Sequence, residues 1–227
     1  FNFIKIKRID YVVICSPSYL HFKHVKKSLL SNCNVIVEKP PLLSLKEFDK
    51  IQLIEKKTKR FCHCIFQLRE DGRIISLKKK ITKEKKINKV NINYFTKRGL
   101  WYQKSWKTKK KLSGGLLINI GIHFVDILLW IFGDLKKIKI LKKNNKNIIG
   151  EFILDYAKVK WNLSITSFSN KYKNVSYHRE MKINKTKINF NKFNNLHIDN
   201  YKSIINKKNY RIGEFKKLFH YINRLKI

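Results

Sequence analysis

The sequence predicts an α/β protein in two parts: an incomplete parallel sheet with crossover helices, then an open antiparallel sheet domain with helices. In the first 68 residues, short apolar runs alternate with helical stretches, a spacing typical of parallel strands with right-handed crossovers. From Leu135 onward, strand-like runs follow one another across short turns, which is typical of antiparallel pairing. Between the two lies a very apolar stretch, Leu116–Phe132, that predicts a buried helix.

The first part is expected to alternate strand and helix. A buried strand begins at Asp10 and ends in a turn at Ser16-Pro17. Ser44, with Glu47 three residues later, forms a capping box, so a helix should follow and run to about Lys57. The other elements expected here are a helix over Tyr19–Ser31, a strand over Asn34–Val37 and a strand over Phe61–Gln67.

The second part should begin with a basic helix near Gly72–Lys85 and a strand over Lys89–Thr96. A loop, Arg98–Lys107, then leads into the apolar helix. We predict a first domain over residues 1–68, a second over 69–212, and a final segment, 213–227, that packs back on the first. The later elements are strands over Lys136–Leu141, Ile149–Tyr156, Lys158–Thr166, Ser176–Ile183 and Lys187–Phe190, and a terminal helix over Gly213–Leu225.

The chain is strongly basic, with 52 Lys and Arg against 15 Asp and Glu and a formal net charge of +37. Such a balance is typical of nucleic-acid or anionic-surface binding. The lysines, however, run along the whole chain, and the runs Lys78–Lys80 and Lys109–Lys111 predict solvated faces or loops. We therefore expect no specific nucleic-acid partner. A basic nucleic-acid-binding protein, whose affinity would fall steeply with salt, stays open as an alternative.

The four cysteines favour buried free thiols in a reducing cytosol over a disulfide or a zinc site, so we expect no metal. The apolar stretch Leu116–Phe132 approaches membrane-spanning length. It carries Asn119, His123 and Asp126, however, and such groups are costly in lipid, so we expect no membrane span. Because the chain begins with Phe1, we expect it to be a fragment of a longer protein.

Polar residues in the apolar helix form the first candidate site. Asn119 and His123 are four residues apart and Asp126 is three further on, so all three should share one helix face. Asp126 is placed to orient or charge-stabilise His123, and a histidine near neutral pKa can accept a proton from a hydroxyl group. The alternative is a core histidine that Asp126 satisfies, with no catalytic role.

The ends of the expected parallel strands supply further candidates. Ser16-Pro17, Glu38-Lys39 and Gln67 should meet at the carboxyl edge of the sheet, where ligands bind such folds. Lys39, followed by Pro40, could hold a hydroxyl and stabilise alkoxide character at that edge. The alternative is an ordinary strand-end lysine in a very basic chain.

The loop Arg98–Lys107 combines two tryptophans and a tyrosine with several cations. The aromatic rings could stack on a base or sugar, and the cations could hold phosphates or a carboxylate. A surface loop packed by its own tryptophans is the equal alternative.

With these residues in place, the chain resembles the Gfo/Idh/MocA oxidoreductases. The motifs that carry this resemblance are Asp10–Pro17 with His21, Glu38-Lys39-Pro40, and Gly114–His123 with Asp126. Finer features resemble one subgroup, the UDP-N-acetyl-2-amino-2-deoxyglucuronate dehydrogenases. These features are Phe66–Arg69, Arg98–Lys107, Asn119 in place of the family's usual Asp, and Asn195–Tyr201.

The resemblance implies a Rossmann domain followed by a sheet domain used for substrate binding and homo-oligomerisation. It implies a cytoplasmic enzyme that oxidises the C3 hydroxyl of a UDP-linked N-acetylated amino-sugar uronate to a ketone. Hydride would pass to NAD, with NADP still open, in bacterial surface-polysaccharide synthesis, for example of O-antigen in lipopolysaccharide.

The resemblance also assigns roles to individual residues. Lys39 would contact the reacting hydroxyl, His123 would be the general base, and Asn119 would position the sugar. Beyond the resemblance, we expect Arg98 and Tyr102 to bind the uronate or diphosphate. The residues expected to bind the cofactor are Ser16, Pro17, His21, Glu38, Lys39, Gln67, Trp106 and Lys107.

Two departures from the family pattern matter. No Gly-x-Gly-x-x-Gly turn follows a first strand, so the phosphate-cradling turn and the acidic ribose-binding residue are expected to lie outside these 227 residues. Glu70-Asp71 stands where the subgroup leads us to expect His-Pro. A dehydrogenase of another sugar or of inositol, and an inactive remnant, therefore stay open as alternatives.

Overall fold

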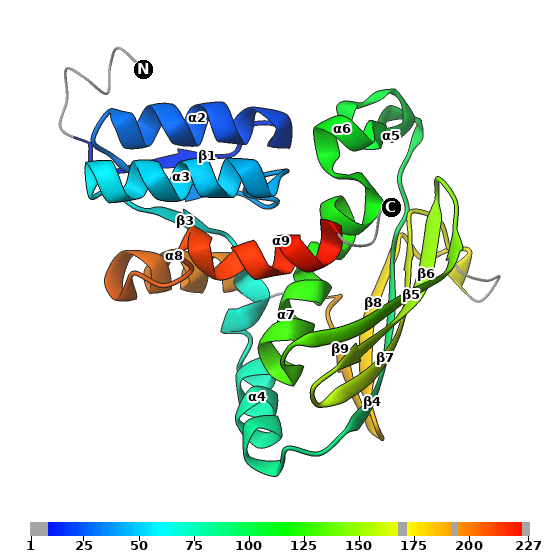
Figure 1. Ribbon diagram of the computed structural model, residues 1–227. Coiled ribbons are helices and arrows are strands. Elements are labelled where there is room, and N and C mark those ends of the chain that lie inside the picture. The colour runs from blue at the N-terminus through cyan, green and yellow to red at the C-terminus, as the bar shows by residue number, and fades with distance from the viewer. Residues whose placement is uncertain (1–8, 168–171, 192–194, 224–227) are drawn as a thin grey trace.

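The computed structural model describes residues 9–167, 172–191 and 195–223 of the chain. Figure 1 shows two sheets that lie apart, with the helices of the middle and end of the chain between them. The predicted fold class is confirmed: a three-stranded sheet is followed by a six-stranded sheet, both with helices.

The first sheet is wholly parallel, in the order β1-β2-β3. Its strands are β1 (Tyr11–Ile14), β2 (Asn34–Val37) and β3 (Cys62–Cys64). The connecting helices are α2 (Ser18–Leu30) and α3 (Leu45–Thr58). Because every connection is a helical crossover, each strand re-enters the sheet in the same direction, and all three carboxyl ends share one edge.

Local sequence sets the bounds of α3. Ser44 Oγ accepts the Glu47 backbone N–H at 3.3 Å, and Glu47 Oε2 accepts the Ser44 N–H at 3.2 Å, which confirms the predicted capping box. At the other end Lys59 adopts a left-handed conformation (φ 56°), and its N–H donates to the Glu55 carbonyl. This residue stops the helix.

The third strand is shorter than the sequence predicts. β3 ends at Cys64, and Gln67 begins a 3₁₀ helix, η1 (Gln67–Glu70), instead of ending the strand. Helix α4 (Gly72–Glu84) follows at once, with the Asp71 carboxylate capping it by accepting the Arg73 N–H at 2.9 Å. The cap sets a sharp turn between the two parts of the chain.

The second sheet has the order β5-β6-β7-β4-β8-β9. Four of its five pairings are antiparallel, but β4 and β7 run parallel, so the expectation of a wholly antiparallel sheet is wrong at this pairing. The chain leaves β4 through a helical crossover, which returns it parallel to β4. The strands are β4 (Asn88–Thr96), β5 (Leu135–Lys143), β6 (Asn147–Leu154), β7 (Ala157–Ser164), β8 (Tyr177–Ile183) and β9 (Thr186–Asn189).

The crossover from β4 to β5 is mostly helical. The stretch predicted as a loop contains two short helices, α5 (Leu100–Lys104) and η2 (Trp106–Thr108). After α6 (Lys110–Ser113) comes a π-helical turn, η3 (Leu117–Gly121), which passes directly into α7 (Ile122–Phe132).

This helical stretch is the most apolar part of the chain. By length and composition the segment Lys110–Phe132 could cross a membrane, but 67% of its most apolar 18 residues are buried inside the protein. A buried core helix has the same length and composition, so these two features are weak evidence for a membrane span. Gly121 brings the helix close to β7, because a Cβ at this position would lie 2.4 Å from Leu163 Cδ1.

The end of the chain returns to the first part. Helix α8 (Leu196–Lys207), which the sequence analysis did not predict, is followed by η5 (Ile212–Phe215) and α9 (Lys216–Asn223). Phe219 of α9 packs on Phe48 of α3, with ring centroids 4.8 Å apart, and Figure 1 shows α9 beside α3. The last two residues of the predicted terminal helix, 224 and 225, lie outside the described residues.

All four cysteines are free thiols. Cys33, Cys62 and Cys64 are buried as expected, whereas Cys15, just after β1, is exposed. Burial raises the pKa of the Cys62 and Cys64 thiols well above its ordinary value, so both stay protonated at neutral pH. Among the residues the structure describes, no group of three His, Cys, Asp or Glu side chains is placed to hold a metal.

Candidate functional site

The carboxyl edge of the parallel sheet gathers the predicted strand-end residues. Ser16 follows β1, Glu38 and Lys39 follow β2, and Gln67 lies just beyond β3. The Gln67 Oε1 atom is buried and has no hydrogen-bond partner within residues 9–167, 172–191 and 195–223. An unsatisfied buried acceptor is costly, so this edge has a polar atom that a bound ligand could satisfy.

Lys39 reaches across from this edge to the apolar helical stretch. Its Nζ donates to the Asn119 carbonyl oxygen at 2.9 Å, over a sequence separation of 80 residues. Burial and the charges of Arg98, Lys107 and Arg179 together lower the pKa of Lys39 to about 8, against the opposing effect of Glu38. Lys39 is therefore a cation that can lose its proton near physiological pH.

Asn119 belongs to the π-helical turn η3, a kind of irregularity often found at functional sites. Its backbone carbonyl accepts from Lys39, and its side-chain amide donates to the Tyr102 hydroxyl at 3.2 Å. Tyr102 is buried, and the Arg98 guanidinium lies over its ring at 5.7 Å from the centroid. The structure thus joins the predicted residues Arg98, Tyr102, Asn119 and Lys39 in one chain of contacts.

His123 lies one turn beyond Asn119, at the start of α7. Its Nδ1 is enclosed and has no hydrogen-bond partner among the described residues, and its ring meets Phe66 edge-on at 5.9 Å. Burial lowers the pKa of His123 well below its ordinary value, and the charges of Lys39, His197 and Arg179 add to the effect. The imidazole is therefore neutral at neutral pH and able to accept a proton.

Asp126 does not serve His123, contrary to the sequence-based interpretation. Its carboxylate accepts two hydrogen bonds from the Arg69 guanidinium, at 2.8 and 2.5 Å. Burial raises the pKa of Asp126, and the Arg69 charge opposes this effect. The carboxylate in turn raises the pKa of Arg69, so the guanidinium stays charged and its two hydrogen bonds favour an ionised pair. The sequence pattern missed this pairing because Arg69 lies in η1, 57 residues away along the chain. The part of the alternative in which Asp126 satisfies a core histidine is wrong for the same reason.

His21 and Ser16 hold the strand ends together. The two ring nitrogens of His21 contact the Pro40 carbonyl at 2.8 Å and the Ser16 carbonyl at 2.7 Å. The Ser16 hydroxyl pairs with His24 Nδ1 at 2.9 Å, and Pro17 is the N-cap residue of α2. His21 therefore ties the end of β1 to the turn after β2, where Lys39-Pro40 is a cis peptide.

The aromatic and basic residues before the apolar helix lie beside the start of α2. Trp106 meets Tyr19 of α2 edge-on, with ring centroids 5.7 Å apart. The Lys107 ammonium lies 5.8 Å from the Trp106 ring centroid and 5.3 Å from that of Trp101. Trp106 and Lys107 thus come close to the β1–α2 turn, which carries Ser16 and Pro17.

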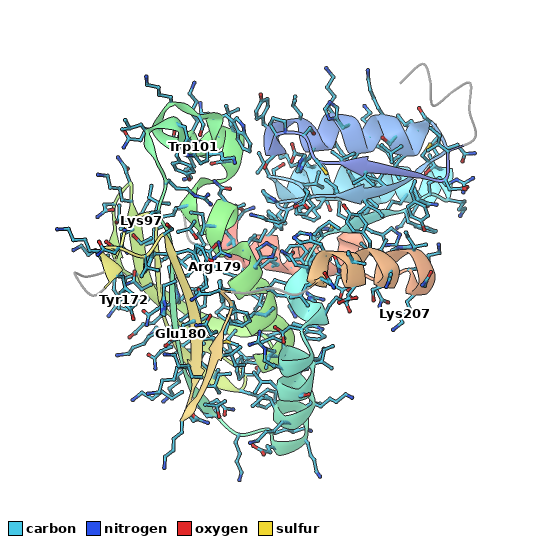
Figure 2. All side chains as sticks on the ribbon, turned by 180° about the vertical axis from the view of Figure 1, so that it is seen from behind. Lys97, Trp101, Tyr172, Arg179, Glu180 and Lys207 are labelled. Carbon is cyan, nitrogen blue, oxygen red and sulfur yellow. The ribbon has the colours of Figure 1, made fainter. Side chains whose placement is uncertain are left out.

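Two basic residues near the site were not assigned by sequence reasoning. Arg179 comes from β8 and His197 from the first turn of α8, and the charges of both act on His123. Strand periodicity could have revealed Arg179, because it alternates with the buried Met181 and Ile183 on one face of β8. Figure 2 labels Arg179 beside the helical segments that lie between the two sheets.

Glu70 and Asp71 have structural partners. The Tyr210 hydroxyl donates to Glu70 Oε1 at 2.5 Å, and Asp71 caps α4 while pairing with Arg73. The departure from the expected His-Pro pair is therefore accommodated by contacts within this chain.

The chain belongs to the Gfo/Idh/MocA oxidoreductases. Residues 2–66 match the domain described as "Oxidoreductase family, NAD-binding Rossmann fold". Residues 78–183 match the "Oxidoreductase family, C-terminal alpha/beta domain". The two matches follow the boundary between the two sheets.

Within this family, the chain is similar to solved structures of WlbA dehydrogenases. The WlbA (WbpB) dehydrogenase from Thermus thermophilus, in complex with NAD and UDP-GlcNAcA, is 29% identical, with a TM-score of 0.93 over 100% of this chain and 76% of that one. A second structure of that enzyme, with NAD and alpha-ketoglutarate, is 31% identical over 92% of this chain and 70% of that one, with a TM-score of 0.87.

Curated relatives are more distant. The putative oxidoreductase YteT of Bacillus subtilis is 25% identical over 58% of this chain, and the scyllo-inositol 2-dehydrogenase (NADP(+)) IolW of the same organism is 25% identical over 66%. The matched segments span 32% and 44% of those proteins.

Proposed function

We propose that this chain supplies the catalytic site of a dehydrogenase that oxidises the C3 hydroxyl of a UDP-linked N-acetylated amino-sugar uronate to a ketone. The observation that carries the proposal is the approach of Lys39 to the helical stretch that bears Asn119 and His123, with Lys39 Nζ 2.9 Å from the Asn119 carbonyl. An ammonium group and a neutral imidazole at one place suit the removal of a hydroxyl proton.

His123 accepts the hydroxyl proton in this mechanism. It begins neutral, because burial and neighbouring cations lower its pKa. Lys39, when protonated, donates a hydrogen bond to the same oxygen and stabilises the negative charge that develops there. Asn119 and Tyr102 hold this part of the turn in place through their 3.2 Å hydrogen bond, so that substrate meets an already organised site.

NAD, when bound, supplies the hydride acceptor. The residues present fit such a group, because the buried Gln67 Oε1 is an unsatisfied acceptor at the strand ends where ligands bind parallel sheets. We assign Ser16, Pro17, Glu38 and Gln67 to the nicotinamide side, and Trp106 and Lys107 to the phosphates. His21 supports this side through the Ser16 and Pro40 carbonyls.

The charge around the site supports an anionic substrate. Arg98, Lys107 and Arg179 all act on Lys39. The Arg98 Nε is buried without a hydrogen-bond partner in the described part of the chain. A diphosphate and a carboxylate would compensate these cations, so we assign Arg98 and Tyr102 to one of them, the uronate or the diphosphate.

The cellular setting is part of the same proposal. We place the enzyme in the cytoplasm, in the synthesis of a bacterial surface polysaccharide such as O-antigen. The complex of the Thermus thermophilus neighbour with UDP-GlcNAcA supports the sugar-nucleotide part of this proposal. We also propose that copies associate through the exposed face of the six-stranded sheet. Lys158, Lys160 and Lys182 are exposed there, so association would require their ammonium groups to be paired or kept at the rim.

A dehydrogenase acting on another sugar or on inositol is the second candidate. The scyllo-inositol 2-dehydrogenase IolW and the D-glucoside 3-dehydrogenase of Escherichia coli, both 25% identical, favour it. The two candidates differ in the charge of the substrate.

Steady-state oxidation of the UDP-linked uronate and of myo-inositol, followed by NADH absorbance, tests the proposal. We expect turnover of the uronate, lowered about 10²- to 10⁴-fold by His123→Ala, since removing a general base has this effect. Lys39→Ala should be similarly impaired. His220→Ala, an exposed histidine on α9, is the matched control and should retain wild-type turnover. Equal or faster oxidation of myo-inositol would contradict the proposed substrate, and normal turnover by His123→Ala would contradict the proposed base.

A further inference from the structure

The inner face of β8 carries one charged side chain that no other assignment uses. Tyr177, Arg179, Met181 and Ile183 alternate on one face of the strand, and Met181 and Ile183 are buried. Arg179 pairs in register with Tyr94 of β4, whose ring meets Phe124 of α7 at 5.0 Å. Arg179 therefore lies on the face of the sheet that α7 covers, the face that carries the site.

The guanidinium is held by its surroundings. Its Cζ lies 5.4 Å from the ring centroid of Tyr94 and 5.1 Å from that of Tyr177, and Nη2 donates to Thr96 Oγ1 at 3.3 Å. The Arg179 backbone N–H donates to Asn191 Oδ1 at 2.8 Å. Aromatic faces and a fixed backbone restrict the rotamers of the side chain, so it is a preorganised cation.

Arg179 differs from Arg98 and Lys107 in the residues whose pKa its charge affects. The charges of Arg98 and Lys107 act on Lys39, whereas the charge of Arg179 acts on both Lys39 and His123. Lys39 and His123 are the two groups assigned to the reacting carbon. Arg179 also lies on the sheet face that α7 covers, so it is near both of these groups, whereas Arg98 and Lys107 belong to the segment before the apolar helix.

We propose that Arg179 binds the sugar carboxylate and thereby selects a uronate over a neutral sugar. The inference rests on the proposed function, because it takes the sugar nucleotide as the substrate. A guanidinium matches the planar geometry of a carboxylate and can bind it through two parallel hydrogen bonds. A carboxylate bound there would also offset the cations that oppose protonation of His123, and so strengthen the base.

Calorimetric titration of the full chain with two ligands tests the inference. The ligands are the UDP-linked N-acetylglucosaminuronate and UDP-N-acetylglucosamine, which has a hydroxymethyl group in place of the carboxylate. We expect the wild-type chain to bind the uronate more tightly. Arg179→Gln should weaken uronate binding about tenfold or more, and binding of the neutral sugar nucleotide less than about threefold, as expected for a hydrogen bond to a charged group.

Lys185→Gln is the matched control, because it removes the same charge from the exposed turn that follows the same strand, six residues further on. It should leave the preference unchanged. Arg179→Lys keeps the charge but not the paired hydrogen bonds, so we expect its preference for the uronate to lie between those of the wild-type chain and Arg179→Gln. If Arg179→Gln does not fold, Arg179→Lys still tests the inference.

The outcomes separate the two proposals. An unchanged preference in both Arg179 variants overturns the inference alone, as does an equal loss of affinity for both ligands, which would place Arg179 at the diphosphate. A wild-type chain that binds neither sugar nucleotide overturns the proposed function and this inference with it.

Discussion

An Asp126→Asn substitution removes one charge from the buried pair with Arg69 while it keeps the size of the side chain. The Asp126 carboxylate is 2% exposed and Arg69 is 12% exposed. Removing one partner of a buried ion pair costs about 3–5 kcal/mol, because the other charge is left uncompensated.

The local contacts of Arg69 narrow this range. Arg69 keeps Glu214 at 3.7 Å and lies over the rings of Trp130 and Phe215, at 5.4 and 4.8 Å from their centroids. These contacts compensate part of the lost charge. We therefore expect a loss at the lower end, about 3 kcal/mol of unfolding free energy.

Urea-induced unfolding followed by tryptophan fluorescence measures the loss. The matched control is Glu84→Gln, which breaks the exposed Lys80–Glu84 pair at 3.8 Å and should cost less than about 1 kcal/mol. A loss below about 1 kcal/mol for Asp126→Asn would refute the reasoning about the buried pair.

The same variant tests the correction to the role of Asp126. If this carboxylate supported His123, its removal would lower the pKa of the imidazole further. We expect little change in an NMR titration of His123, because the Asp126 oxygens are held by Arg69. A clearly lowered pKa would restore the interpretation that Asp126 assists the base.

Two further predictions concern Lys39 and glycine packing. Because the pKa of Lys39 falls from 10.5 to about 8 on folding, the unfolded chain holds more protons between these values, and stability should rise with pH there, by up to about 3 kcal/mol. Lys39→Met should abolish that rise in urea midpoints, and parallel profiles would contradict it. Gly150→Ala should cost about 1–3 kcal/mol in thermal or urea unfolding, because a Cβ would lie 2.4 Å from the Trp161 ring and 2.7 Å from the Lys139 carbonyl. Gly72→Ala, with open space around it, is the control, and an equal loss would refute the packing argument.

Local sequence patterns were sufficient to predict most of the helices and strands. The alternation of apolar runs and helices predicted the parallel order of the first sheet, and the Ser44–Glu47 spacing predicted a cap that the structure has. Such features depend on neighbours within a few residues. Helix α8 escaped prediction because its apolar face is narrow, with Asn200, Ser203 and Ile204 as its buried residues.

The residue types of the candidate site were also visible in the sequence. Strand ends placed Lys39 and Gln67 at one edge, and the spacing of Asn119 and His123 placed both on one helix face. The order of the motifs along the chain predicted that the strand-end residues would meet the polar residues of the apolar helix. The hydrogen bond from Lys39 to the Asn119 carbonyl joins these two groups of residues.

Pairings between distant residues required the tertiary structure. Spacing along a helix could not show that Arg69 takes the Asp126 carboxylate, or that Arg179 of β8 acts on His123. The parallel pairing of β4 with β7 likewise depends on where the chain re-enters the sheet.

The sequence by itself determined which segments are helices and strands and which polar side chains stand at their ends, because hydrogen bonds and side-chain periodicity act over a few residues. Only the tertiary structure decided which charges are buried together. Burial and the approach of distant cations depend on how helices and sheets pack in space, and they determine which of these groups is neutral and which is ionised at neutral pH.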